Sequence, residues 1–419
     1  MPNIENLNWI SHMKLTVPLL LLVLLSVTGL SRAQVKTSLL DLTDNMWGIL
    51  PSLSRPANHS RIFYAVMFDA GSTGTRIHIY TFIQSDSELP VLDNEMFHSI
   101  KPGLSAYADS PEMAGHTVRM LLKVAKKTVP RLEWKRTPLV LRATAGLRLL
   151  AAEKAQLLLK QVQHVFDESP FLVPDNSVSV MNGTNEGILA WISLNYLTGE
   201  YCKLKTVGIL DLGGGSTQIT FLPKLRKTIE SVPVADYVAR FDIFNSTFEL
   251  YTYSYLGNGL MAARLATLGA VGAEGTVHEQ ELPLAVCYAG YKLCYQEVLK
   301  VVKGIIHQPY ELKDSNVFYA FSYYFDRAVD AGLIDGVRGG MLEVRDFKKR
   351  AKEVCNKMTK YPPISSFLCM DLTYITCLLK DGFGFKESTV LQLTKKVNNV
   401  EASWALGATL DHFHNLNIH

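Results

Sequence analysis

Two stretches of the chain repeat one order of residue types. An apolar run, an aspartate, a turn of glycines with serine and threonine, and a second apolar run occur in "YAVMFDAGSTGTRIHIYTF" from Tyr64 and in "VGILDLGGGSTQITFLP" from Val207. Glycines let the backbone approach a ligand closely, so that successive amide N–H groups can point at an anion, and hydroxyls add further donors. Both turns therefore have the composition of a phosphate-binding loop.

The aspartates that open these turns are Asp69 and Asp211. Carboxylates at this place can hold a divalent cation against the same phosphates, through water in the case of magnesium. The candidate phosphate-binding residues are Gly71, Ser72, Thr73, Gly74 and Arg76 in the first turn and Gly213, Gly214 and Gly215 in the second. One such turn alone is usually a β-hairpin with a polar tip, but two copies with matching flanks favour a phosphate clamp.

The composition argues against several other classes of protein. The 419 residues are 48% hydrophobic and 19% charged, which is ordinary for a folded chain with room for two domains. A net charge of +3 is too small for a nucleic-acid footprint, so we expect no nucleic-acid partner. The sequence has neither a P-loop nor a Gly-x-Gly-x-x-Gly turn that opens a helix, and it therefore supports neither a P-loop enzyme nor a Rossmann fold.

The segments around the turns carry the apolar patterns of strands and helices. The patterns predict strands at residues 63–68, 76–82, 138–141, 206–210 and 218–222, and helices at 112–129, 153–166 and 187–197. This order indicates an α/β protein in which the strand–turn–strand plan occurs twice.

The first 33 residues resemble a secretory signal peptide. Lys14 precedes an apolar run at residues 15–30, and Ser31-Arg32-Ala33 offers small residues for cleavage before Gln34. An uncleaved anchor is the alternative, although the run is short for a span of about 20 apolar residues. No second apolar stretch approaches that length, so we expect no stable membrane span after cleavage. Sequons for N-glycans begin at Asn58, Asn182 and Asn245.

The six cysteines favour disulfides over a metal site. No Cys-x-x-Cys pair occurs, and no histidine lies nearby at the spacing of zinc ligands. The natural local pairs are Cys287 with Cys294 and Cys355 with Cys369, which would leave Cys202 and Cys377 free. Spacing alone does not prove this connectivity.

Five motifs, in order, resemble the five apyrase-conserved regions of the nucleoside triphosphate diphosphohydrolases. They are "FDAGSTGTR", "LRATAGLRLL", "VMNGTNEGILAWISLNYLTG", "ILDLGGGSTQITFLP" and "SWALGAT". Within this family, "KPGLSA", "FYAFSYYFDRA", "FLCMDLTYI" and "TVLQLTKKVNNVE" are most similar to the soluble lumenal nucleoside diphosphatases of the endoplasmic reticulum. The resemblance spans the chain from Tyr64 almost to its end.

The resemblance implies the α/β fold of the actin, Hsp70 and sugar-kinase superfamily, with two RNase H-like lobes and an active-site cleft between them. After the signal peptide (1–33) and an N-terminal segment (34–59), lobe I is expected at residues 60–182, completed by 400–419, and lobe II at 183–399. Each lobe would then contribute one of the two phosphate turns.

The candidate for the catalytic base is Glu186. Hydrolysis of a phosphoanhydride needs an in-line water, a group that accepts its proton, and positive charge on the phosphoryl oxygens. Taken alone, an acid at a helix start would be a surface residue favoured by the helix dipole. By resemblance, Glu186 activates the water, Ser216 and Gln218 orient it, and Thr144 in "ATAGLR" faces the same site.

Tyr323 and Tyr324, in "AFSYYFD", fall where the family places an aromatic platform for the nucleobase. Stacking tolerates different bases, so such a platform would accept several nucleotides. The alternative is that both tyrosines are half-buried helix positions. Arg76 is either a phosphate ligand or a surface residue at a strand end, and Arg148 is expected to anchor a helix start.

The resemblance implies a hydrolase that removes the terminal phosphate of nucleoside diphosphates, prefers UDP and GDP, and uses calcium or magnesium. Asp69 and Asp211 match the acids that hold this cation through its water ligands. The chain would act as a monomer in the endoplasmic reticulum lumen or after secretion, and removal of UDP would support glycoprotein folding and glycosylation. The alternatives are a sugar-kinase-like phosphotransferase, against which Glu186 and the signal peptide argue, and an ATP-binding switch of the actin and Hsp70 type.

One segment departs from the family pattern. Between "ARLATLGA" and "CYQEVLKVV" relatives carry a longer excursion that contains a cysteine, whereas this chain has only "VGAEGTVHEQELPLAVCYAGYKL". In relatives a distant upstream cysteine pairs with the one that matches Cys294, and here Cys287 is the only nearby candidate. A strained or absent bridge is therefore an alternative to the local pair, and we expect a less stable lobe II with unchanged chemistry.

Overall fold

The computed structural model describes residues 61–84, 90–200, 205–243, 246–269, 287, 290–310, 312, 317–358 and 366–415. The chain divides into two compact units, residues 1–61 and 62–419, and the sheets and helices named below belong to the second unit apart from Arg61 at the start of the first strand. The predicted signal peptide, the N-terminal segment, the sequons at Asn58 and Asn245, and Cys202 lie outside the described residues. Within the described ranges, no helix is long and apolar enough to cross a membrane.

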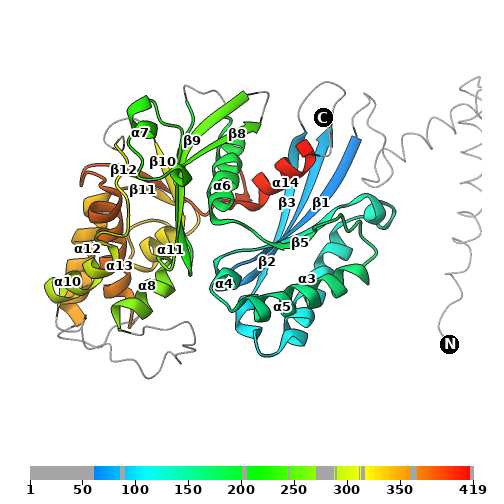
Figure 1. The fold of residues 1–419 in the computed structure, drawn as a ribbon, viewed down its shortest axis with the longest axis horizontal. Helices are drawn as coiled ribbons and strands as arrows, with labels where there is room; N and C mark the ends of the chain where they lie inside the picture. The colour runs from blue at the N-terminus through cyan, green and yellow to red at the C-terminus, as the bar shows by residue number, and fades with distance from the viewer. Residues whose placement is uncertain are drawn as a thin grey trace, which may run out of the picture. The chain divides into compact units, whose positions relative to one another are not determined.

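The first glycine turn belongs to a five-stranded sheet with the strand order β3-β2-β1-β4-β5 (Figure 1). Its strands are β1 (Arg61–Ala70), β2 (Thr75–Gln84), β3 (Val91–Ile100), β4 (Leu139–Ala143) and β5 (Val178–Val180). β1, β4 and β5 are parallel, whereas β2 pairs antiparallel with β3. The second half of β1 is buried because elements cover both faces of the sheet, and β1 ends just after Asp69.

The second turn belongs to a seven-stranded sheet with the order β11-β12-β10-β6-β7-β9-β8. Its strands are β6 (Gly208–Leu212), β7 (Ser216–Phe221), β8 (Val238–Ile243), β9 (Ser246–Leu256), β10 (Phe318–Ser322), β11 (Gly340–Glu343) and β12 (Val390–Leu393). β6, β10 and β12 are parallel, and β6 and β7 form an antiparallel hairpin. In both sheets the glycine turn thus follows the carboxyl end of a parallel strand, where open α/β sheets bind ligands.

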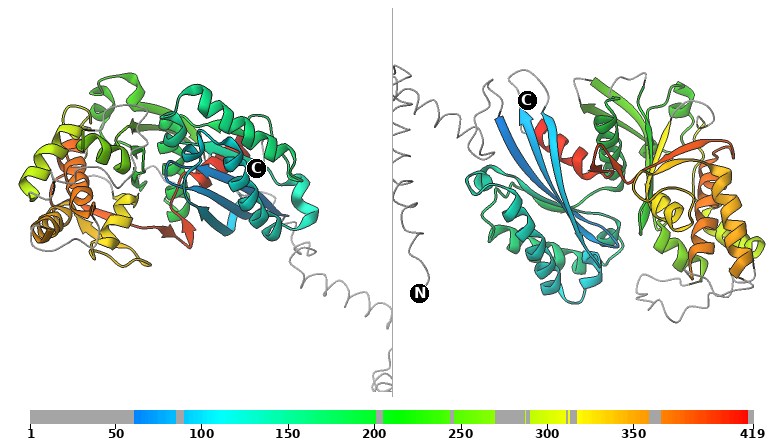
Figure 2. Two further views of the ribbon diagram at one scale, coloured as in Figure 1. Left: turned by 90° about the horizontal axis from the view of Figure 1, so that it is seen from below. Right: turned by 180° about the vertical axis from the view of Figure 1, so that it is seen from behind.

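Two helices, α6 (Gly183–Thr198) and α14 (Ala405–Asn415), pack between the two sheets (Figures 1 and 2). Their apolar side chains share one core with Met67 and Phe82 of the first sheet and with Ile209 and Phe248 of the second. The side chain of Asn182 accepts a hydrogen bond from the Thr184 N–H at 2.8 Å and caps the start of α6. Short strands β13 (Lys396–Val397) and β14 (Val400–Glu401) precede α14.

The other long helices cover the outer faces of the sheets. α3 (Pro111–Thr128) and α5 (Ala152–Asp167) form the outer core of the first sheet. The second sheet is covered by α8 (Leu260–Thr267), α10 (Tyr291–Val302), α11 (Tyr323–Asp330), α12 (Val344–Met358) and α13 (Leu368–Cys377). The remaining short helices and helical turns are α4 (Ala145–Arg148), α7 (Arg226–Glu230), Leu104–Tyr107, Arg131–Arg136, Ala235–Tyr237 and the π-helical Leu378–Phe383. Every strand and helix predicted from the sequence is present, with ends shifted by a few residues.

Two disulfides stabilise this outer layer of helices. The pairs Cys287–Cys294 and Cys355–Cys369 confirm the local pairing predicted from spacing, so the bridge at Cys294 is not absent. The two disulfides are neighbours in space: the sulfur of Cys369 lies 4.0 Å from the sulfur of Cys294. Among the described cysteines, Cys377 alone has a free thiol, and it is buried.

Candidate active site

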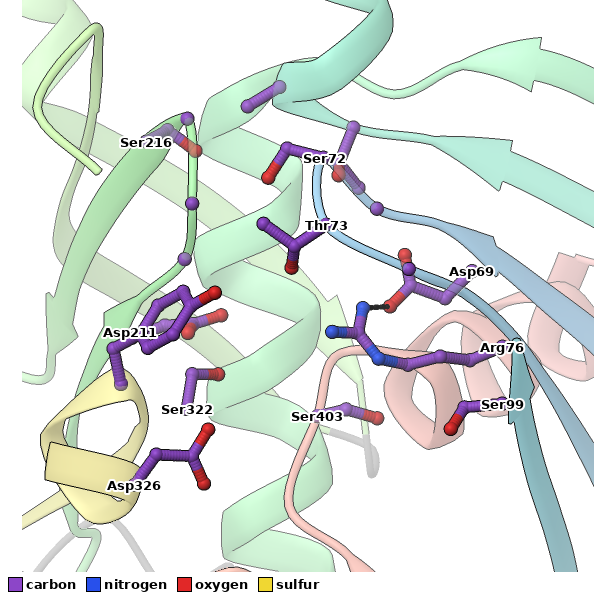
Figure 3. Close-up of a pocket in the computed structure, with 18 of the residues that line it drawn as sticks. Asp69, Ser72, Thr73, Arg76, Ser99, Asp211, Ser216, Ser322, Asp326 and Ser403 are labelled. Atoms are coloured by element: carbon purple, nitrogen blue, oxygen red, sulfur yellow. Dashed lines mark hydrogen bonds and ion pairs between the residues drawn. The ribbon is translucent and has the colours of Figure 1, made fainter. Parts of the chain in front are cut away.

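The two glycine turns line one cavity of about 450 Å³ (Figure 3), a size typical of a small-molecule site. A Cβ added at Gly214 would lie 2.6 Å from the Ser72 hydroxyl oxygen and 2.6 Å from Thr73 Cγ2, so the tips of the turns are in contact. The cavity brings together all eight predicted phosphate-binding residues, namely Gly71, Ser72, Thr73, Gly74, Arg76, Gly213, Gly214 and Gly215.

The backbone N–H groups of Gly214 and Gly215 in the second turn point away from the start of α8. The carbonyl of Gly213 accepts from the Leu260 N–H at 2.8 Å, and that of Gly214 accepts from the Met261 N–H at 3.0 Å. Both carbonyls therefore face the start of α8. In a planar trans peptide the N–H points away from the carbonyl of the same unit, so the N–H groups of Gly214 and Gly215 face the other side. Adjacent amides that point into one space form an anion-binding site.

The first turn rests on a neighbouring loop. A Cβ added at Gly103 would lie 2.2 Å from the Gly71 carbonyl oxygen, so only glycine allows this close approach. The Thr144 N–H donates to the Ala70 carbonyl at 3.2 Å, which ties the turn to the end of β4. The same bond holds Thr144 on the cavity wall, where the sequence predicts it.

Asp69 and Asp211 enter the cavity from the two sheets (Figure 3). Arg76 Nη1 donates to Asp69 Oδ2 at 2.7 Å, whereas Asp211 forms no ion pair within the described part of the chain. Burial raises the pKa of Asp211 to about 6, against the lowering effect of a hydrogen bond with Ser322. One oxygen of each aspartate, Oδ1, is buried and has no hydrogen-bond partner among the residues that the structure describes. Two unpaired carboxylate oxygens at one cavity suit the water ligands of a divalent cation.

Glu186 lies in the first turn of α6 and lines the same cavity. Arg148 donates a hydrogen bond from Nη2 to Glu186 Oε2. Burial raises the pKa of Glu186 to about 8, the charge of Arg148 opposes this rise, and the charges of Asp211 and Asp69 add to it. A carboxylate with such a pKa can accept a proton near neutral pH.

Ser216 lines the cavity, and Gln218 supports it from within the sheet. Gln218 Nε2 donates to the Ser216 and Ser254 hydroxyl oxygens, each at 2.8 Å. Gln218 itself is buried and is not part of the cavity wall. Gln218 therefore fixes the orientation of the Ser216 hydroxyl.

The structure brings Tyr323 to the cavity but not Tyr324. Tyr324 is fully buried in the core of the second sheet. Successive residues of a helix point about 100° apart, so these two side chains cannot both face one ligand. The Arg327 guanidinium lies 5.6 Å from the centre of the Tyr323 ring. This cation–π contact helps to hold the ring in position.

Sequence reasoning missed two sets of charged contacts at the cavity. Arg148 anchors a helix start as expected, but the residue that it binds there is Glu186 in the first turn of α6, and this partner was not predicted. Arg264 and Arg327 line the cavity and both bind Asp371, which is fully buried. The bonds measure 2.7 Å from Arg264 Nε, 2.7 Å from Arg264 Nη2 and 3.3 Å from Arg327 Nη1. These residues come from three helices, and no local pattern signals them.

Two α/β sheets, each with a glycine turn at a cavity that is also lined by Asp69, Asp211 and Glu186, are the arrangement expected of a phosphate-binding protein. The sequence matches the GDA1/CD39 (nucleoside phosphatase) family over residues 55–275 and 288–419, and the chain belongs to this family. The match is interrupted between residues 275 and 288, within the segment that departs from the family pattern.

Individual relatives and a solved structure agree with this assignment. The chain is 55% identical over 403 residues to ectonucleoside triphosphate diphosphohydrolase 5 of Gallus gallus, with 89% of this chain and 93% of that protein covered. It is 53% identical over 397 residues to the nucleoside diphosphate phosphatase ENTPD5 of Homo sapiens, with 88% and 92% covered. A crystal structure of nucleoside triphosphate hydrolases from Neospora caninum superposes with a TM-score of 0.63 at 12% identity, covering 91% of this chain and 97% of that chain. This match shows that the two chains share the same two-lobed α/β fold.

Proposed function

We propose that the protein hydrolyses nucleoside diphosphates to monophosphates and orthophosphate, with UDP and GDP preferred. The observation that carries this proposal is one cavity lined by both glycine turns and by a buried acid of raised pKa, Glu186. The similarity to a human nucleoside diphosphate phosphatase supports diphosphates as the substrate class.

In the proposed reaction, Glu186 takes a proton from a water whose oxygen attacks the terminal phosphorus. The bond from this phosphorus to the bridging oxygen breaks, and the nucleoside monophosphate leaves. The Ser216 hydroxyl, held by Gln218, and Thr144 orient the water. Arg148 keeps the Glu186 carboxylate in position through its hydrogen bond.

The two turns would bind the phosphoryl oxygens through their amides and hydroxyls, together with Arg76. A calcium or magnesium ion, held by Asp69 and Asp211 through its waters, would supply positive charge to these oxygens. The unpaired Oδ1 atoms of both aspartates support this assignment. Tyr323 would serve as the stacking surface for the nucleobase.

The proposed place of action is the secretory pathway, either the endoplasmic reticulum lumen or the exterior after secretion. Two disulfides support an oxidising compartment. There the protein would act as a monomer, and removal of UDP would support glycoprotein folding and glycosylation.

Phosphate release from UDP, GDP, ADP and UTP by the purified protein tests the proposal. With calcium or magnesium we expect faster release from UDP and GDP than from ADP or UTP, and EDTA should abolish release because the carboxylates need a cation to bind a diphosphate. Release that persists in EDTA, or no release from any diphosphate, would contradict the proposed function.

A further inference from the structure

Asp326 is an acid of the cavity that the proposed reaction does not use. It lies on α11 three residues after Tyr323 and lines the cavity. Figure 3 shows its carboxylate next to Ser322, on the side away from Ser72 and Ser216. The side chain is half-buried and makes no hydrogen bond or ion pair with any residue that the structure describes.

The neighbouring cations do not satisfy this carboxylate. Arg327 is already engaged, because its Nη2 binds Asp330 at 2.7 Å and its Nη1 binds Asp371 at 3.3 Å. Lys395 and Lys101 line the same cavity, and their charges act on Asp326 without an ion pair among the described residues. Burial nevertheless raises the pKa of Asp326 above its ordinary value. A partly desolvated carboxylate that lacks donors is unfavourable, and a ligand that supplies a donor removes this cost.

The place of Asp326 in the cavity points to the nucleoside part of a substrate. The phosphate-binding turns lie on the far side of Ser322, and a diphosphate bound there would be repelled by a further carboxylate. A carboxylate accepts hydrogen bonds and donates none. Tyr323, on which a base can stack, lies on the same helix face, since residues three apart on a helix are neighbours. The donors of a nucleoside are its ribose hydroxyls and the ring N–H of bases such as uracil.

We propose that Asp326 is a specificity-determining residue whose carboxylate accepts a hydrogen bond from an O–H or N–H donor of the bound nucleoside. The inference rests on the nucleoside diphosphatase activity proposed above. Asp326 acts on binding of the nucleoside and takes no part in cleavage of the phosphoanhydride.

The test compares wild type and Asp326→Ala on UDP, 2′-deoxy-UDP, 3′-deoxy-UDP and 3-methyl-UDP. With wild type, the analogue that lacks the bonded donor should lose about 10–100-fold in kcat/KM, as expected for a hydrogen bond to a charged group. With Asp326→Ala, UDP should fall to the level of that analogue, and removal of the same donor should then cost nothing. A loss with a deoxy analogue assigns the bond to the ribose, and a loss with 3-methyl-UDP assigns it to the base.

Asp330→Ala is the matched control, because Asp330 lies on the same helix and binds Arg327 but does not line the cavity. It should keep wild-type selectivity. If it reproduces the effect of Asp326→Ala, or if all analogues lose equally in both proteins, the proposal is wrong. Asp326→Asn keeps the shape and one acceptor oxygen, and it should lie between wild type and the alanine variant. No hydrolysis of UDP by wild type would instead refute the proposed function.

Discussion

The two glycine turns share one plan, but their acids have different surroundings. Asp69 is paired with Arg76 of its own hairpin, whereas Asp211 has no ion-pair partner among the described residues and its pKa is raised to about 6 by burial. The first turn therefore contains a cationic side chain, Arg76, that pairs with its aspartate. The second turn has no such side chain, so its aspartate depends on the positive charge of a bound cation. We infer that the two turns share phosphate binding and that Asp211 contributes more than Asp69 to binding of a cation.

The largest predicted effect comes from substitution of a residue outside both turns, Glu186. Because Glu186 is assigned as the base, Glu186→Gln should lower kcat for UDP by about 10²–10⁴-fold. Binding of UDP should change little, because the turns remain intact. Steady-state kinetics and equilibrium binding of UDP measure the two quantities separately.

Glu153→Gln makes the same chemical change in the first turn of α5, at an exposed residue, and should leave kcat unaltered. Activity of Glu186→Gln near that of the Glu153→Gln control would remove Glu186 from its role.

The pH dependence of kcat/KM should report the pKa of Glu186. Glu186 must be deprotonated to act, and burial raises its pKa to about 8, so activity should fall as the pH drops below this value. The expected loss approaches tenfold per pH unit below the pKa, which is about fiftyfold between pH 8 and pH 6. Cation binding neutralises Asp69 and Asp211, whose charges raise this pKa, so saturating cation should move the acid limb to lower pH. An acid limb at the ordinary glutamate value of 4.5 would argue against a buried base.

Asp211→Asn and Asp69→Asn compare the turns directly. Loss of a carboxylate that holds a metal's waters costs about 10–100-fold in metal affinity or activity. Asp211→Asn should fall at the upper end of this range, and Asp69→Asn at the lower end, because Arg76 remains to attract phosphate. The readout is the calcium or magnesium concentration that gives half-maximal phosphate release. Equal shifts in both variants would show that the difference in surroundings has no functional consequence.

The smallest effect should come from a methyl group at the contact between the turns. Gly214→Ala places a Cβ 2.6 Å from Ser72 Oγ, whereas Gly74→Ala places one 3.5 Å from the Ile100 carbonyl oxygen, which is ordinary contact. Overpacking costs about 1–3 kcal/mol, so Gly214→Ala should weaken UDP binding by about tenfold. Gly74→Ala should bind UDP like wild type. If the two variants bind equally, the turns do not need their close approach.

The sequence predicted both hairpins and their site residues because each hairpin is contiguous in the chain. The strand patterns, the acids and the glycines all lie within a few residues of one another at each turn. By contrast, β3 was not predicted, because its side chains are mostly exposed and give no apolar signal. A strand with that burial is defined by its pairing with β2.

Contacts between distant residues could not be predicted. Arg264 and Asp371 are 107 positions apart, and Arg148 and Glu186 are 38 apart. Only the packing of helices and turns brings these charges together. The identical neighbours Tyr323 and Tyr324 face opposite environments for the same reason, since the rotation of α11 decides which ring lines the cavity.

A crystal structure of Glu186→Gln with UDP and calcium tests the central claim most directly. We predict that the terminal phosphate lies between the two turns, with its oxygens within hydrogen-bond distance of the Gly214 and Gly215 amides and of the Ser72 hydroxyl, and that the waters of calcium contact Asp69 and Asp211. A diphosphate bound to one turn alone, or outside the cavity, would contradict the account.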